Sequence, residues 1–206
     1  MSAQVTTLIG TTKVIPVLAF TEVASTLKII ENMIRSGVTV IELTLRSPVA
    51  RETLRAAKSA FGKDAAIGMG TVINAAQLTD IINDGADFGV SPGLTPALQH
   101  AILDSGLPFL PGVANVSQAM AAQDAGFKLL KFFPAEQAGG APYLKSIGAV
   151  LPDVKFCPTG GITEANAAAY LALPNVICVG SSALTKRAAE DSYAPDAFDA
   201  VLKAFT

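Results

Sequence analysis

Short runs of β-branched and aliphatic residues alternate with helical patterns along the chain. Continuous apolar runs are typical of buried parallel strands, and apolar positions three and four residues apart indicate amphipathic helices. Eight strands are predicted, over Val14–Leu18, Val38–Arg46, Ala66–Gly70, Asp87–Ser91, Leu107–Leu110, Lys128–Phe133, Val154–Cys157 and Val176–Val179. Helices are predicted over Ala24–Arg35, Val49–Ala60, Ala75–Asp84, Pro96–Asp104, Val116–Asp124, Ala141–Val150, Glu164–Leu171 and Asp196–Phe205.

The regular alternation of strand and helix predicts the fold. Strand starts recur roughly every 20–28 residues, the length of one strand, one helix and two short loops. Glycines at positions 37, 85, 106 and 126 end several helices just before the next strand, as left-handed C-caps do. We expect an α/β fold with one domain over residues 1–206, a (β/α)8 TIM barrel with a short N-terminal helix, rather than an open doubly wound sheet.

The strand Val38–Arg46 is unusual because it carries charges where a buried parallel strand should be apolar. Side chains alternate along a strand, so Glu42, Thr44 and Arg46 share the face predicted to point into the barrel. A structural Glu42–Arg46 ion pair is one interpretation. Buried ion pairs seldom stabilise a fold more than apolar packing does, so the pattern favours a functional site.

A further charged residue, Lys131, lies within the apolar strand Lys128–Phe133. If Leu130 and Phe132 pack against the helices, Lys131 points into the barrel near its carboxyl-terminal end, where barrel active sites lie. Schiff-base chemistry needs a neutral amine, which apolar surroundings favour. Glu42 on another strand would then be the general acid/base. A lysine that reaches solvent is the alternative interpretation.

Glycine-rich loops follow the last two predicted strands, at Pro158–Thr163 and Gly180–Ser182. Glycine lets backbone N–H groups approach an anion, and the start of a helix adds a positive dipole end. Barrels often bind phosphate at this location. Each loop could instead be only a tight turn, but the two together favour phosphate binding.

Composition narrows the classes of partner. The net charge of −2 with scattered lysine and arginine argues against a nucleic-acid or membrane-surface protein, so a small molecule is expected. No signal sequence or long apolar span is visible, which predicts a cytoplasmic protein. Cys157 and Cys178 lie in strand-like segments and are interpreted as reduced core thiols. The single histidine, His100, has no metal-ligand spacing around it.

Six motifs in fixed order resemble the 2-keto-3-deoxy-6-phosphogluconate (KDPG) aldolases, which also act on 4-hydroxy-2-oxoglutarate (KHG). The motifs cover nearly the whole chain: Ile41–Arg46, Gly68–Val72, Val90–Thr95, Leu110–Val113, Lys131–Glu136 and Phe156–Ile162. The resemblance implies a class I aldolase that forms a Schiff base and needs no cofactor or metal. It also implies a homotrimer, for which the sequence pattern gives no evidence.

The resemblance assigns roles to residues of this chain. Lys131 would form the Schiff base and Glu42 would move protons, in agreement with the strand patterns. Arg46 and Thr71 would hold the pyruvoyl end, and Pro92, Phe133 and Thr159 would surround the substrate. Phosphate would lie near Gly160, Gly161, Gly180 and Ser182. The family often reads Gly-Gly-Ser and then a large aromatic residue, whereas this chain reads Gly180-Ser181-Ser182-Ala183, so its phosphate loop could differ in shape.

Other functions fit parts of the pattern. The partial glycine motif Gly68–Thr71 lacks the third glycine of a dinucleotide fingerprint, which argues against a nicotinamide cofactor. A metal-dependent aldolase or a phosphosugar isomerase could use the same barrel, but histidine is scarce. An aldolase for the galactonate epimer, or a sugar-phosphate-binding barrel without catalysis, is also compatible. The binding barrel would not need a buried lysine.

Overall fold

A computed structural model describes residues 2–185, 199, 202–203 and 205. Nine strands lie in this part of the chain: β1 Val14–Leu18, β2 Val40–Thr44, β3 Ala66–Gly70, β4 Gly89–Val90, β5 Phe109–Leu110, β6 Gly112–Val113, β7 Leu129–Phe132, β8 Lys155–Pro158 and β9 Val179–Ser181. The helices are α1 Ser2–Ile9, α2 Val23–Arg35, α3 Ala50–Phe61, α4 Ala75–Asn83, α5 Pro96–Ser105, α6 Val116–Asp124, α7 Gly140–Val150 and α8 Ala167–Leu171. The helix predicted over Asp196–Phe205 falls largely outside the described residues.

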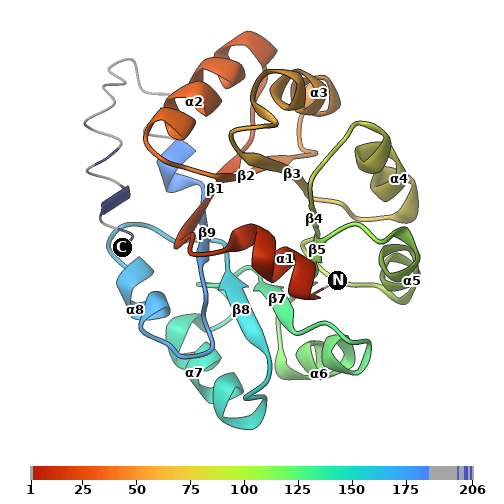
Figure 1. The fold of residues 1–206 in the computed structure, drawn as a ribbon. Coiled ribbons are helices and arrows are strands. Elements are labelled where there is room, and N and C mark those ends of the chain that lie inside the picture. Colours follow the sequence, from red (N-terminus) through yellow and green to blue (C-terminus); the bar gives the residue numbers. More distant parts are fainter. Residues whose placement is uncertain (1, 186–198, 200–201, 204, 206) are drawn as a thin grey trace.

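All strand pairs are parallel, as the alternation of strands and helices predicted, and they form two sheets. One sheet has the order β5-β4-β3-β2-β1-β9 and the other β6-β7-β8. The sheets lie around a common centre with α2 to α8 outside (Figure 1). The sequence-based expectation of eight strands differs from this result at Pro111, which separates β5 from β6. Proline has no backbone N–H to donate to a neighbouring strand, so strand pairing is interrupted there.

Several predicted elements are shorter or shifted in the structure. The last strand was expected over Val176–Val179, but β9 begins at Val179 and ends at Ser181. Val176 makes a single parallel bridge to Phe156. The helix expected from Glu164 begins at Ala167. Asn166 explains the late start, since its side chain accepts a hydrogen bond from the Thr163 N–H and donates one to the Gly161 carbonyl. These bonds hold a turn in place of the first helical turn.

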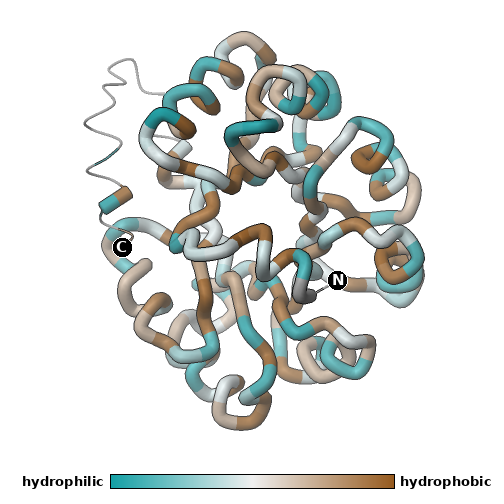
Figure 2. The backbone as a smooth tube through the Cα atoms, viewed as in Figure 1, coloured by the Kyte–Doolittle hydropathy of each residue, from teal (hydrophilic) through white to brown (hydrophobic). Residues whose placement is uncertain are grey.

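The core has two layers, which follow from the alternation of side chains along the strands. Between strands and helices lies a large cluster that includes Ile41, Leu43, Leu130 and Phe132. Inside the sheets lies a smaller cluster that includes Leu129, Cys157 and Cys178. Val5 and Ile9 of α1 belong to this cluster and cover it on one side. Figure 2 shows the hydrophobic positions concentrated along the strands and on the inward sides of the helices. The site must therefore lie at the end opposite α1.

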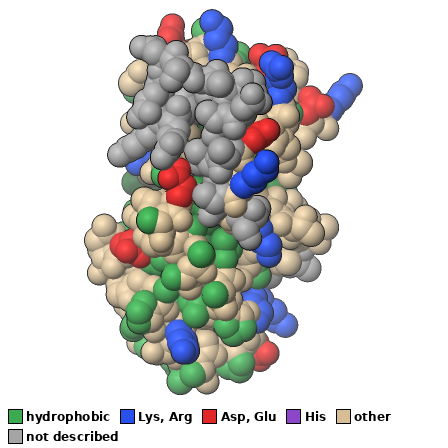
Figure 3. Space-filling model, turned by 90° about the vertical axis from the view of Figure 1, so that its left-hand side faces the viewer, with side chains coloured by type: hydrophobic (Ala, Val, Ile, Leu, Met, Phe, Trp, Pro, Cys, Tyr) green, Lys and Arg blue, Asp and Glu red, His purple; other side chains and the backbone are tan. Residues whose placement is uncertain are grey.

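The two cysteines are buried free thiols, as expected. A hydrogen bond that the Cys178 thiol donates to Cys157, followed by burial, raises the pKa of Cys178. In the part of the chain that the structure describes, no helix has the length and apolar character needed to cross a membrane. On the face seen in Figure 3, basic and acidic side chains are interspersed over the upper part rather than gathered into a patch of one sign.

Candidate active site

A cavity of about 310 Å³ opens at the carboxyl ends of the strands. Its walls come from residues in or just beyond strands β1, β2, β3, β4, β7, β8 and β9. Every residue assigned to the site from sequence lines this cavity: Glu42, Arg46, Thr71, Pro92, Lys131, Phe133, Thr159, Gly160, Gly161, Gly180 and Ser182. Val17, Thr44 and Ile162 complete the lining without having been assigned a role. A larger hollow of about 630 Å³ lies at the amino-terminal side of β1 and β2, remote from these groups.

An ion pair between Lys131 and Glu42 forms the floor of the cavity. The Lys131 Nζ lies 3.2 Å from Glu42 Oε1 and 3.5 Å from Oε2. Their side chains are only 6% and 4% exposed. The alternation rule placed both side chains inward correctly, because their strand neighbours pack in the outer layer. Glu42 therefore pairs with Lys131, and the alternative of a Glu42–Arg46 pair is wrong.

Gly70 creates the space that Glu42 occupies. A Cβ at position 70 would come within 1.9 Å of Glu42 Oε1, so any side chain would displace the carboxylate. The glycines of the Gly68–Thr71 segment thus serve close packing, Gly68 against Phe88 and Gly70 against Glu42. On the other side of the lysine, Nζ lies 5.4 Å from the centre of the Phe133 ring. The amine thus lies between a carboxylate and an aromatic face.

Arg46 reaches the cavity from its rim, where it is exposed, and not from the interior as its strand position suggested. Buried Thr44 links it to the neighbouring strand. The Thr44 hydroxyl donates to the Leu18 carbonyl at 2.9 Å and accepts from Arg46 Nε at 3.2 Å. Thr44 was predicted to point inward, but no sequence pattern indicated this link.

Thr71 has a left-handed backbone with φ of 65°. This conformation is uncommon for a β-branched residue and costs about 1–2 kcal/mol. Such strain is found mostly where function requires a particular backbone path. The conformation was not predictable from sequence, because threonine at this position would ordinarily indicate extended chain.

The two glycine-rich loops meet at one end of the cavity. Gly160 and Gly161 have φ of 102° and 79°, which other residues rarely adopt, so the loop requires glycine. Gly180 allows Thr159 to approach, since a Cβ there would come within 2.3 Å of the Thr159 Oγ1. Ser182 lies in the second loop and is exposed to the cavity. The arrangement is a concave surface of backbone and small side chains, suited to an anion.

Behind the first loop, Tyr170 of α8 donates a hydrogen bond to Glu136. Burial, followed by the interaction with Glu136, raises the pKa of Tyr170, so the hydroxyl stays protonated and keeps donating. A Cβ on Gly161 would come within 2.6 Å of the Glu136 side chain, so Glu136 packs directly against the loop. The loop is thus supported from α8.

Within the described residues, no group of three or more histidine, cysteine or acidic side chains could hold a metal ion.

Comparison with known proteins places this chain in a family. The family model described as KDPG and KHG aldolase matches residues 5–198. A 2-dehydro-3-deoxy-phosphogluconate aldolase of Zymomonas mobilis is 45% identical over 170 residues, 82% of this chain and 80% of that protein. The KHG/KDPG aldolase of Escherichia coli K12 is 39% identical over 175 residues, 85% of this chain and 82% of that protein.

A solved structure is similar over nearly the full length. The KDPG aldolase of Legionella pneumophila, with pyruvate captured as a covalent carbinolamine intermediate, has a TM-score of 0.88 and 40% identity. The match covers 98% of this chain and 96% of that one. Parallel α/β architecture and a buried lysine–carboxylate pair in a cavity define the class: the protein is an aldolase, a carbon–carbon lyase. Within that class, the chain belongs to the KDPG and KHG aldolase family.

Proposed function

We propose that this protein is a class I aldolase that cleaves 2-keto-3-deoxy-6-phosphogluconate to pyruvate and glyceraldehyde 3-phosphate through a Schiff base on Lys131. The observation that carries the proposal is the buried Lys131–Glu42 pair at the floor of a cavity large enough for a small substrate. Burying two charges is costly, and a chemical role for both explains why the fold retains them.

The reaction begins when Glu42 accepts a proton from the Lys131 ammonium, to which it is hydrogen-bonded. The neutral amine attacks the C2 ketone of the substrate, and Glu42 gives its proton to the departing water as the iminium forms. The Glu42 carboxylate then takes the proton of the C4 hydroxyl, the C3–C4 bond breaks, and the bonding electrons move to the iminium to form the enamine of pyruvate. Glyceraldehyde 3-phosphate leaves, Glu42 returns that proton to C3, and water hydrolyses the resulting iminium to release pyruvate.

The other residues of the cavity hold the substrate at its two ends. Arg46, fixed by Thr44, and Thr71 hold the carboxylate of the keto acid, since a guanidinium and a hydroxyl are suited to it. Pro92, Phe133 and Thr159 surround the reacting carbons. The terminal phosphate binds to the backbone of Gly160, Gly161 and Gly180 and to Ser182. The same chemistry would cleave 4-hydroxy-2-oxoglutarate to pyruvate and glyoxylate, an activity that the name of the Escherichia coli relative includes.

The two sheets, in this proposal, form one closed (β/α)8 barrel within a single domain over residues 1–206. The bridges Phe156–Val176 and Thr159–Gly180 support closure between β8 and β9, and only Pro111 separates β5 from β6.

Following the family resemblance, the protein is a cytoplasmic homotrimer. Light scattering on the purified protein tests the oligomeric state.

Trapping with borohydride tests the Schiff base. Pyruvate and borohydride together should inactivate the enzyme and leave a stable three-carbon adduct on Lys131, located by peptide mapping. Lys128, which is exposed and immediately precedes the same strand, provides the matched control: Lys128→Met should still be trapped and Lys131→Met should not. An adduct on a different lysine would refute the proposal.

Treatment with EDTA tests the class of mechanism independently. Because the iminium takes up the electrons of the broken bond, no metal is needed as a Lewis acid, and activity should survive exhaustive chelation. Loss of turnover that a divalent cation restores would rule out the class I mechanism.

A further inference from the structure

Ser181 is a buried polar residue at the end of β9 with no role in the reaction described above. Its side chain is 1% exposed. The hydroxyl donates to the Ile162 carbonyl at 2.7 Å and accepts from the Ala183 N–H at 3.1 Å. Ile162 belongs to the loop after β8, and Ala183 follows β9. One hydroxyl therefore joins the two loops that form the anion-suited end of the cavity.

The segment that begins at Ser181 is anchored at both ends. On the backbone side, Ser181 is in register with Pro16 of β1. Four residues later, buried Thr185 donates from its Oγ1 to the Val17 carbonyl at 2.9 Å. Ser182, which lies between these anchors, is thus held in a fixed place beside the Gly160–Ile162 loop.

The residue after Ser182 explains why such a link is needed in this chain. Ala183 offers little apolar surface for packing the loop. The Ser181 hydroxyl holds the two loops together by hydrogen bonds, whereas a large side chain would hold them by apolar packing.

We propose that Ser181 is a positioning residue for the terminal phosphate of the substrate, setting the distance between Ser182 and the Gly160–Ile162 loop so that both can contact one anion. The inference rests on the proposed phosphate site and adds the device that shapes it. Ser181 does not touch the substrate itself. Its effect should therefore appear only with phosphorylated substrates.

The test compares 2-keto-3-deoxy-6-phosphogluconate with 2-keto-3-deoxygluconate, the same molecule without phosphate. Ser181→Ala should raise the KM for the phosphorylated substrate about 3- to 10-fold, the effect of one net hydrogen bond on binding. Kinetics with the unphosphorylated substrate should not change. Ser181→Gly, which also removes the hydroxyl, should raise the KM for the phosphorylated substrate by a similar factor. Ser146→Ala, which removes an exposed hydroxyl–carbonyl bond on α7, is the matched control and should change neither substrate.

Inhibition by inorganic phosphate provides a second readout, measured against cleavage of the unphosphorylated substrate. Its inhibition constant should weaken by a similar factor in both Ser181 variants. The positioning role would be overturned if both variants kept the wild-type preference for the phosphorylated substrate. It would also be overturned if kcat/KM fell equally for both substrates. If the wild-type protein itself shows no preference for phosphate, the proposed phosphate site fails instead, so the two failures are distinguishable.

Discussion

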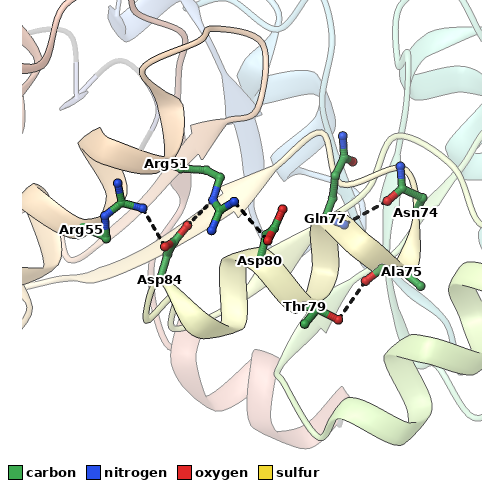
Figure 4. A network of polar contacts seen from close by, with 8 residues as sticks. All are labelled: Arg51, Arg55, Asn74, Ala75, Gln77, Thr79, Asp80 and Asp84. Carbon is green, nitrogen blue, oxygen red and sulfur yellow. Dashed lines mark hydrogen bonds and ion pairs between the residues drawn. The ribbon is translucent and has the colours of Figure 1, made fainter.

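Two groups of ion pairs in this protein differ in burial and in consequence. Lys131 and Glu42 form an isolated pair inside the sheets, both almost fully buried. Between α3 and α4, Arg51 and Arg55 instead bind Asp84, and Arg51 also binds Asp80 (Figure 4). In that network the arginines are 42% and 53% exposed, and only Asp84 is buried, at 6%.

The difference shows how burial separates chemical from structural ion pairs. The helix network connects adjacent elements through solvated arginines, so each contact contributes little and none requires a further reason. The ammonium of Lys131 and the carboxylate of Glu42 lose their hydration when the protein folds, and both line a cavity. A pair that is expensive to form and accessible to a small molecule indicates catalysis.

The largest expected effect comes from removing the internal lysine. Lys131→Met should lower cleavage by at least about 10⁴-fold, because Lys131 is the lysine among the described residues that line the cavity. It should also destabilise the fold by about 3–5 kcal/mol at neutral pH, since Glu42 is left buried without a partner. Steady-state kinetics and denaturant unfolding measure the two effects.

A double variant serves as the control for that stability loss. Adding Glu42→Gln to Lys131→Met should restore most of the lost stability while activity stays absent, because no unpaired charge remains buried. Wild-type stability in the single variant would show that the internal pair is not the costly arrangement described here.

Glu42→Gln alone should lower turnover about 100-fold or more, because the amide keeps the shape of the carboxylate but cannot move protons. Circular dichroism should show an intact fold. Asp84→Asn, the equivalent change in the surface network, is the matched control and should leave turnover unchanged. Near-normal activity of Glu42→Gln would reduce Glu42 to a structural partner of Lys131.

A new charge at the cavity rim should have a smaller and more selective effect. Ser182→Asp should reduce the advantage of phosphorylated over unphosphorylated substrate about 10-fold, because a carboxylate would repel the anion. Ser182→Asn, similar in size and uncharged, separates repulsion from crowding. Equal rates with and without phosphate in the wild type would shift the assignment toward cleavage of hydroxyoxoglutarate.

The smallest effect is expected in the surface network. Asp84→Asn should lower stability by about 1–2 kcal/mol, since hydrogen bonds from two arginines weaken, and should leave catalysis unaffected. The hydrogen bond from Arg51, followed by that from Arg55, lowers the pKa of Asp84 below its ordinary value. Its stabilising effect is therefore present above about pH 4 and lost as the pH falls through the lowered pKa. Below that pH, unfolding curves of wild type and Asp84→Asn should converge.

Sequence patterns predicted most of the architecture and the chemistry. Alternation along two strands placed Glu42 and Lys131 inside correctly because parity is a local property of an extended chain. Element boundaries were less accurate. The strand predicted over Leu107–Leu110 is only two residues long, and a further strand, β6, follows Pro111. Side-chain hydrogen bonds of Asn166 delay the start of α8, because such bonds compete with the first helical turn.

Only the tertiary structure decided which side chains meet. Lys131 and Glu42 are 89 residues apart in the chain, and no local pattern states that their atoms lie 3.2 Å from each other. The same holds for Ser181, whose neighbours in sequence gave no sign of its bond to Ile162, and for the left-handed backbone of Thr71. The physical reason is that hydrophobic periodicity is written into each segment separately, whereas contacts between segments depend on how all the strands pack around one centre.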